Sequence, residues 1–261
     1  MPYHSIFVAD GKESKLGQEI STMDMLGRLC AISAPFVGGV IIVQLGFNQL
    51  YTLSFVLILV AALPLFFTPH HLHPPLPSIK KIWHGFWQRD FRKSRVSFAA
   101  AGIEDQVNGV LWPFFLFLIV KNYEVMGGLT SAALLASFIF LFPAGKLVDE
   151  KDKSKVLRLG AFGNGFVWIA KIFTKTIPQV FIADLSHKIV SIFHSISFSA
   201  IFYTEANHKG TLQYLIWREW ALYAGRLGIL VLSIILIFAG INWIYIFTLA
   251  ALASFFTTTI L

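Results

Sequence analysis

The sequence Gly46-Phe47-Asn48-Gln49-Leu50-Tyr51 joins two long apolar stretches, and the similar sequence Gly240-Ile241-Asn242-Trp243-Ile244-Tyr245 joins two more near the other end of the chain. Each first stretch carries the same tripeptide, Gly27-Arg28-Leu29 in one copy and Gly225-Arg226-Leu227 in the other. The spacing within the copies differs by four residues, which is about one helical turn. In a membrane chain, an internal repeat of helix pairs is typical of transport proteins.

The composition is that of a membrane protein. Only 13% of the 261 residues are charged and 56% are hydrophobic, and the mean hydropathy is +0.69. A soluble domain carries about 25% charged residues, so no soluble core could bury this much apolar surface. We therefore expect the lipid bilayer to be the main partner. The net charge of +7 does not indicate nucleic acid, because the basic residues lie mainly between the apolar stretches.

The apolar stretches are long enough to cross a bilayer, which takes about 20 residues in a helix. The sequence therefore predicts an all-α membrane protein with eight transmembrane helices. Their predicted bounds are 22–45, 48–67, 96–120, 126–145, 157–174, 177–203, 213–239 and 242–261.

Lysine and arginine are concentrated in alternate connections. Residues 68–95 contain six of them and the 146–156 turn contains four, whereas the connections at 46–47 and 240–241 contain none. Basic connections remain on the cytoplasmic side of a membrane. The pattern predicts a multi-pass protein of the cell (plasma) membrane with both termini in the cytoplasm.

The 68–95 connection has two parts. The first is a proline-rich spacer that contains His70, His71 and His73. Proline restricts its backbone and no fourth ligand is close, so an interfacial linker is favoured over a metal site. The second part repeats aromatic and aliphatic residues at helical spacing among lysines and arginines, which predicts an amphipathic helix on the anionic leaflet.

The chain resembles the major facilitator superfamily of transporters, which have twelve helices in two six-helix halves. The two hinge copies lie six predicted helices apart, as pairs 5–6 and 11–12 would. Gly145-Lys146-Leu147-Val148-Asp149, with Lys153 and Lys155 beyond it, resembles the family's cytoplasmic loop signature between helices 8 and 9. Asp152 replaces the usual glycine of that signature, and Glu150 a common arginine.

The resemblance implies that the chain corresponds to helices 5–12. Residues 1–67 would be the remainder of the N-terminal bundle, 68–95 the central cytoplasmic loop and 96–261 the C-terminal six-helix bundle. The four earlier helices of the family are absent from this sequence. We expect either a fragment or N-terminally truncated sequence, or a natural eight-helix protein that completes its cavity by association.

Segment 177–203 has one polar helical face. Ionisable residues at membrane depth usually face a bundle interior or an aqueous path, and Asp184 and Lys188 can pair at this spacing. A cavity-lining role is favoured over a stripe that only packs against other helices. The resemblance makes this the tenth helix, which lines the family's cavity. The residues of this face are Asp184, His187, Lys188, Ser191, His194, Ser195 and Phe198.

Segment 96–120, the seventh helix by the resemblance, carries Glu104, Asp105 and Asn108. Desolvation favours the neutral form of a buried carboxylate, as a proton-coupling site requires. The alternative is a structural carboxylate paired with Arg226 or Arg218. His187 or His194 could also carry protons.

Arg28 and Arg226 occupy matching places in the repeat, which favours a structural, gating role over substrate contact. The resemblance implies that Asp149 meets the start of the first helix and a cationic partner when the cytoplasmic side closes. Gly145 and Lys153 belong to the same gating group. Helix N-termini attract anions, which agrees with that contact.

The leading hypothesis is secondary active transport of a small solute by alternating access, with H⁺ or Na⁺ as candidate coupling ions. The alternative is a non-transporting receptor or scaffold derived from a transporter, or an inactive fragment. No metal-spacing motif, nucleophile elbow or phosphate loop is present in the sequence. We therefore expect no enzyme activity, cofactor or metal, and the motifs do not identify the substrate.

Overall fold

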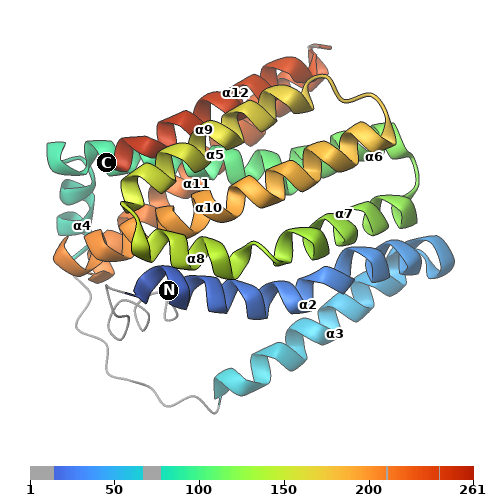
Figure 1. Cartoon of the computed structure of the whole chain (residues 1–261), viewed down its shortest axis with the longest axis horizontal. Helices are drawn as coiled ribbons and strands as arrows, with labels where there is room; N and C mark the ends of the chain where they lie inside the picture. Colours follow the sequence, from blue (N-terminus) through green and yellow to red (C-terminus); the bar gives the residue numbers. More distant parts are fainter. Residues whose placement is uncertain (1–14, 67–77, 210, 241) are drawn as a thin grey trace.

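The regular structure is helical throughout the part of the chain described by the computed structural model, which is residues 15–66, 78–209, 211–240 and 242–261 (Figure 1). The spacer with His70, His71 and His73 lies outside the described residues. The α-helices are α2 (Leu16–Leu45), α3 (Phe47–Phe66), α4 (Ile79–Phe86), α5 (Arg92–Gln106), α6 (Trp112–Val120), α7 (Tyr123–Phe138), α8 (Leu141–Glu150), α9 (Lys153–Lys171), α10 (Ile177–Lys209), α11 (Thr211–Phe238) and α12 (Trp243–Phe256). Three short turns complete the set: η2 (Arg89–Phe91), the π-helical η3 (Val107–Leu111) and η4 (Thr257–Ile260).

Several of these helices fit a multi-pass membrane protein. Among the described residues, six are long and apolar enough to cross a membrane, or seven if the bent pair α7–α8 counts as one span. The predicted span 157–174 is not among them. It corresponds to α9, whose apolar run is interrupted by Arg158, Asn164 and Lys171.

Both copies of the repeat form a helix, a sharp hinge and a second helix. Gly46 has φ = 91° and Gly240 has φ = 69°, a region that side chains other than glycine rarely adopt. In the second copy, Asn242 also caps α12, because its side-chain oxygen accepts a hydrogen bond from the Ile244 amide at 3.2 Å. The hinges predicted from the sequence are therefore confirmed.

Two predicted connections are largely helical instead. Helix α8 continues to Glu150, so the Gly145–Asp149 signature lies on a helix rather than in a loop. The turn can be short because Asp152 caps α9, its carboxylate accepting a hydrogen bond from the Ser154 amide at 2.9 Å. Helix α10 likewise runs on to Lys209, beyond its predicted end at residue 203.

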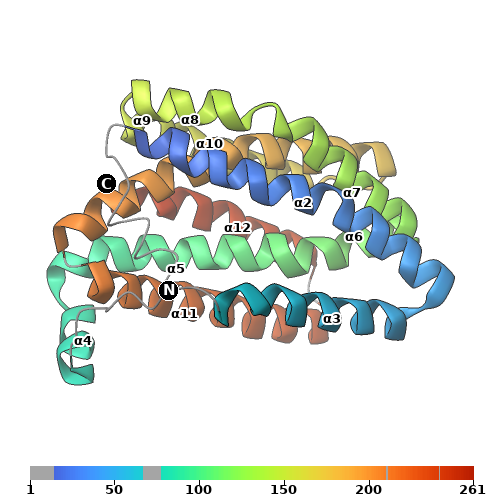
Figure 2. The ribbon, with the colours of Figure 1, turned by 90° about the horizontal axis from the view of Figure 1, so that it is seen from below.

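Helices α2 and α3 form one side of the bundle (Figures 1 and 2). Helix α2 lies along α7 and α8, and α3 packs against α2 with most of its side chains exposed. On the other side, α5 pairs with α11, and α9 packs against both α10 and α12. Exposed apolar surface of this extent, as on α3, is typical of helices that lipid surrounds.

Helix α4 crosses one end of the bundle (Figure 2). The predicted amphipathic helix is shorter than expected, because a 3₁₀ turn follows Phe86. Part of its apolar face does not meet the bilayer: Ile82 and Phe86 are buried, and the Trp217 indole N–H donates to the Ile82 carbonyl at 2.7 Å. Trp83 and Trp87 remain exposed beside Lys80 and Lys81 and keep the interfacial character that the pattern predicts.

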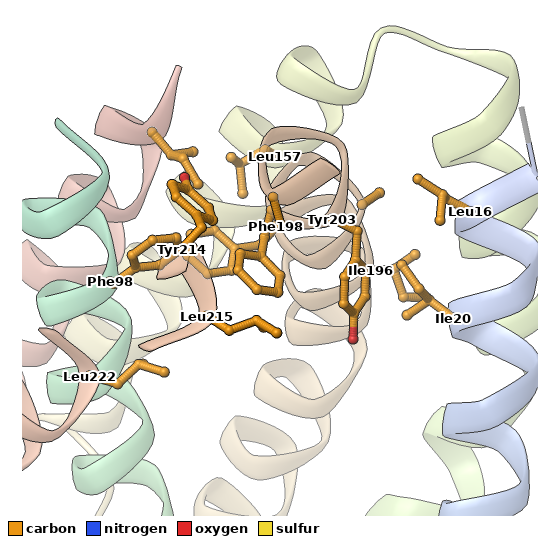
Figure 3. Packing of buried hydrophobic residues seen from close by; sticks show 14 of the residues in the cluster. Leu16, Ile20, Phe98, Leu157, Ile196, Phe198, Tyr203, Tyr214, Leu215 and Leu222 are labelled. Carbon is orange, nitrogen blue, oxygen red and sulfur yellow. The ribbon is translucent and has the colours of Figure 1, made fainter. Parts of the chain in front are cut away.

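The buried apolar side chains form two clusters. The first, near the beginning of α2 and the end of α8, includes Phe98, Ile196 and Tyr214 (Figure 3). The second includes Val107, Val180 and Ile229. Along α5, α10 and α11, several polar residues lie between these clusters, and they form the candidate site.

Candidate cavity site

A cavity of about 300 Å³ lies between α5, α9, α10 and α11. Eight residues singled out from the sequence line it: Glu104, Asp105, Asn108, His187, Ser191, His194, Ser195 and Phe198. Asn108 belongs to the π-helical turn η3, a distortion often found at functional sites. Arg226, predicted to have a gating role, also lines the cavity. Asn164 and Arg218 complete its polar wall, although neither was predicted to do so.

Glu104 is buried, with 7% of its surface exposed. Its Oε1 atom accepts hydrogen bonds from the Asn164 amide at 2.9 Å and from the Trp168 indole N–H at 3.5 Å. Its Oε2 atom has no hydrogen-bond partner among the described residues. The alternative, a structural carboxylate paired with Arg226 or Arg218, holds for Asp105, which pairs with Arg226, but not for Glu104, because Arg218 pairs with Glu219.

Both cavity arginines come from α11 and form ion pairs. Arg226 pairs with Asp105 of α5, and Arg218 pairs with its neighbour Glu219 at 2.7 Å. The Arg218 guanidinium also lies over the Phe202 ring, 4.7 Å from its centroid. In the described part of the chain, the Nε atom of neither arginine has a hydrogen-bond partner. The Asp105 side chain is 60% exposed, so the cavity is open beside it.

The two histidines have different surroundings. The His194 Nε2 atom lies 2.8 Å from the Thr257 hydroxyl oxygen. That hydroxyl also lies within hydrogen-bond distance of the Ser254 carbonyl, at 2.6 Å. The His187 ring meets Trp168 edge to face, with centroids 4.9 Å apart. No described residue is a hydrogen-bond partner of its Nδ1 atom.

A second buried cluster adjoins the cavity and centres on Lys171, which the sequence reasoning missed. Its Nζ atom lies 4.1 Å from the Trp112 ring centroid and 4.0 Å from that of Trp168. It is fully buried and makes no hydrogen bond to any described residue. The sequence did contain a signal for this cluster, because Lys171 follows Trp168 by three residues at the end of an apolar run.

The predicted pair Asp184–Lys188 belongs to this cluster rather than to the cavity wall. The Lys188 ammonium lies 3.2 Å from Asp184 Oδ2, which confirms the pairing. Asp184 Oδ1 accepts a hydrogen bond from the Trp112 indole N–H at 3.1 Å. The two tryptophans that enclose Lys171 therefore also contact Asp184 and Glu104, which connects the cluster to the cavity.

The predicted gating residues lie at two helix crossings. Asp149 accepts hydrogen bonds from the Gly17 and Gln18 amides at 2.7 and 3.0 Å, at the start of α2. A Cβ atom on Gly145 would collide with Ser21 and the Gly17 carbonyl, so only glycine permits this crossing. An Arg28 guanidinium nitrogen lies 3.5 Å from the Ser137 hydroxyl of α7. Lys153 begins α9.

Comparisons with protein-family models, with curated proteins and with solved structures found no match. Function is therefore inferred from the cavity and its surroundings. Within the described residues, no group of three or more His, Cys, Asp and Glu side chains could hold a metal ion. The cavity offers hydrogen-bond donors and acceptors of both charges, which suits binding of a small polar molecule.

Proposed function

We propose that this protein is a secondary active transporter of the major facilitator type, which moves a small solute through the cavity by alternating access. The observation that carries the proposal is a cavity with charged walls between two apolar clusters of a membrane-type helix bundle. Charged groups at that depth are expensive and usually serve a solute or ion pathway. Transporters bind their solutes at this level, between barriers on either side.

The proposed architecture has eight transmembrane helices that correspond to helices 5–12 of the family. Helix α9 would complete the set of eight and correspond to the ninth helix of the family, because it packs within the bundle against both α10 and α12. The matching hinges at Gly46 and Gly240 support the repeat on which this numbering depends. The contact of Asp149 with the start of α2 supports the proposed closure of the cytoplasmic side.

The proposed location is the plasma membrane, with both ends of the chain in the cytoplasm. The starts of α2 and α9 and the end of α12 lie at one end of the bundle, together with α4 (Figure 1). That end holds the basic 80–95 and 146–158 segments. Under the positive-inside rule it faces the cytoplasm.

H⁺ is the favoured coupling ion. Glu104 is a buried carboxylate with one unpartnered oxygen, and His187 also has an unpartnered ring nitrogen. Both residues line the cavity, so a proton there and a solute would influence each other. Na⁺ is the other candidate and would compete for the same carboxylate.

Accessibility to a membrane-impermeant maleimide tests alternating access without knowledge of the solute. In a Cys30→Ser background, Ser195→Cys places a thiol in the cavity wall. Lys153→Cys and Lys175→Cys mark the two ends of the bundle. We expect Lys175→Cys to react from outside the cell, Lys153→Cys only after permeabilisation, and Ser195→Cys from either side. Reaction of Ser195→Cys from one side only would favour the receptor or scaffold alternative.

Two substitutions test the site assignment once a transported solute is found. Glu104→Gln and Asp184→Asn should each reduce uptake or efflux at least tenfold while membrane insertion is unchanged, because both remove a buried charge and retain an acceptor oxygen. Glu150→Gln is the matched control, since this glutamate is 58% exposed and pairs with Lys146 one turn away. Unchanged transport in both site variants would rule out this assignment.

A further inference from the structure

The charges in and beside the cavity are balanced. Four acidic and four basic side chains lie in or beside the cavity: Glu104, Asp105, Asp184 and Glu219, with Lys171, Lys188, Arg218 and Arg226. A ligand with a net charge would leave an uncompensated charge in a region of low dielectric constant, which is unfavourable. A ligand with no net charge avoids this penalty.

Among the described residues, both acceptors and donors of the cavity wall lack a partner. Glu104 of α5 and Asn164 of α9 contact each other, and each has a side-chain oxygen to which no described residue donates. Arg218 and Arg226 both belong to α11, and the described residues offer no acceptor to either Nε–H group. The pair on α5 and α9 thus requires a hydrogen-bond donor, and the pair on α11 an acceptor.

Burial makes these missing partners significant. Glu104 is 7% exposed and Asn164 is fully buried, so water in the surroundings does not solvate the two oxygens. Buried polar atoms nearly always have a partner. Because all four residues line the cavity, a ligand within it can supply donors to the two oxygens and acceptors to the two Nε–H groups after small side-chain rotations.

We propose that the cavity binds a small zwitterion of amino-acid size, with its ammonium group at Glu104 and Asn164 and its carboxylate at Arg218 and Arg226. The volume of about 300 Å³ is at the lower end of ligand-binding pockets, which suits a molecule of this size. Phe198, the aromatic residue in the wall, lies beside the apolar part of such a ligand. The proposal rests on the proposed transport function, because it names the substrate class of the same cavity.

Thermal unfolding of the purified full chain in detergent tests this proposal with defined probes. The zwitterions are glycine, L-alanine, L-serine, L-leucine and L-glutamine; ethylamine, propionate and glycerol supply the cation, the anion and the neutral alcohol. We expect at least one amino acid to raise the unfolding midpoint by about 3 °C at ten times its Kd. Ethylamine, propionate and glycerol should leave the midpoint unchanged at the same concentration.

Two variants test which residues bind the ammonium group and which bind the carboxylate of the ligand. Glu104→Gln keeps the oxygen that accepts from Asn164 and Trp168 but loses the charge, and Arg218→Lys keeps a positive charge but loses the Nε–H donor. Each should abolish the midpoint shift. The exposed residues Glu150 and Arg158 provide the matched controls Glu150→Gln and Arg158→Lys, which should retain it.

The proposal is overturned if no amino acid shifts the midpoint of the unmodified chain, or if ethylamine, propionate or glycerol shifts it as much. This result is independent of the thiol-labelling result. Two-sided labelling without amino-acid binding would leave transport standing and remove the substrate class. Amino-acid binding with one-sided labelling would indicate a receptor.

Discussion

At the residue scale, Lys171 is an unusual feature because its ammonium group is buried between two indole rings. Each ring attracts a desolvated cation by up to about 2 kcal/mol. Removal of the ammonium group from water costs several kcal/mol, and no carboxylate lies within ion-pair distance among the described residues. These effects nearly cancel, so the buried ammonium group contributes little net stability.

Replacement of Lys171 tests that balance. Lys171→Met preserves most of the side-chain volume, so we expect the free energy of unfolding to stay within about 1 kcal/mol of the parent. Lys171→Ala leaves a hole between the tryptophans and should lose about 2–4 kcal/mol. Urea or thermal unfolding in detergent would measure both. A loss of more than about 2 kcal/mol for Lys171→Met would show that the buried charge stabilises the fold.

At the element scale, the two copies of the repeat share a hinge but differ in what they pack against. Gly225 on α11 lies against the Ala99 backbone of α5, where any Cβ atom would collide with the carbonyl oxygen. Gly27, its counterpart on α2, has nothing within 4 Å of an added Cβ atom. Identical local sequence therefore occupies a tight helix crossing in one copy and an open face in the other.

The same substitution should therefore have opposite effects in the two copies. Gly225→Ala forces α5 and α11 apart and should reduce the free energy of unfolding by about 1–3 kcal/mol. Gly27→Ala meets no obstacle and should raise it by up to about 1 kcal/mol, because alanine favours the helix. Matched unfolding experiments would measure both values. Equal losses in the two variants would contradict the difference between the copies.

At the scale of the whole molecule, Asp149 joins the start of α2 to α8. Its carboxylate caps the start of α2 from α8, across 132 residues of sequence. Because the acceptor is charged and α2 presents its N-terminal amides, the contact combines a cap with a favourable helix-dipole interaction. Glycines at 17 and 145 allow the two helices to approach closely enough for it.

Loss of this contact should loosen α2 without unfolding the bundle. We expect Asp149→Ala to cost about 1–2 kcal/mol and to speed hydrogen exchange at the first turns of α2. Asp152→Ala is the control, because Asp152 caps only its own helix, α9. Hydrogen-exchange mass spectrometry of the two variants would separate the effects. Unchanged exchange in α2 would show that Asp149 does not hold α2 against α8.

Local sequence was enough to predict the helical membrane character, the two hinges and most of the residues that line the cavity on α5 and α10. These depend on local properties: the length of an apolar run, the backbone freedom of Gly46 and Gly240, and the side chains on one helical face. Asp184 and Lys188 could be paired correctly for the same reason, because one helical turn separates them.

The packing of the helices sets which groups meet across them, and the sequence did not reveal those contacts. Glu104 binds Asn164 and Trp168 rather than an arginine, Lys171 lies between two tryptophans, and part of the α4 apolar face is buried on α11. Each of these contacts joins residues far apart in sequence, and their partners depend on the rotation and crossing of packed helices. Helical periodicity fixes which side chains share a face but not which helix covers that face.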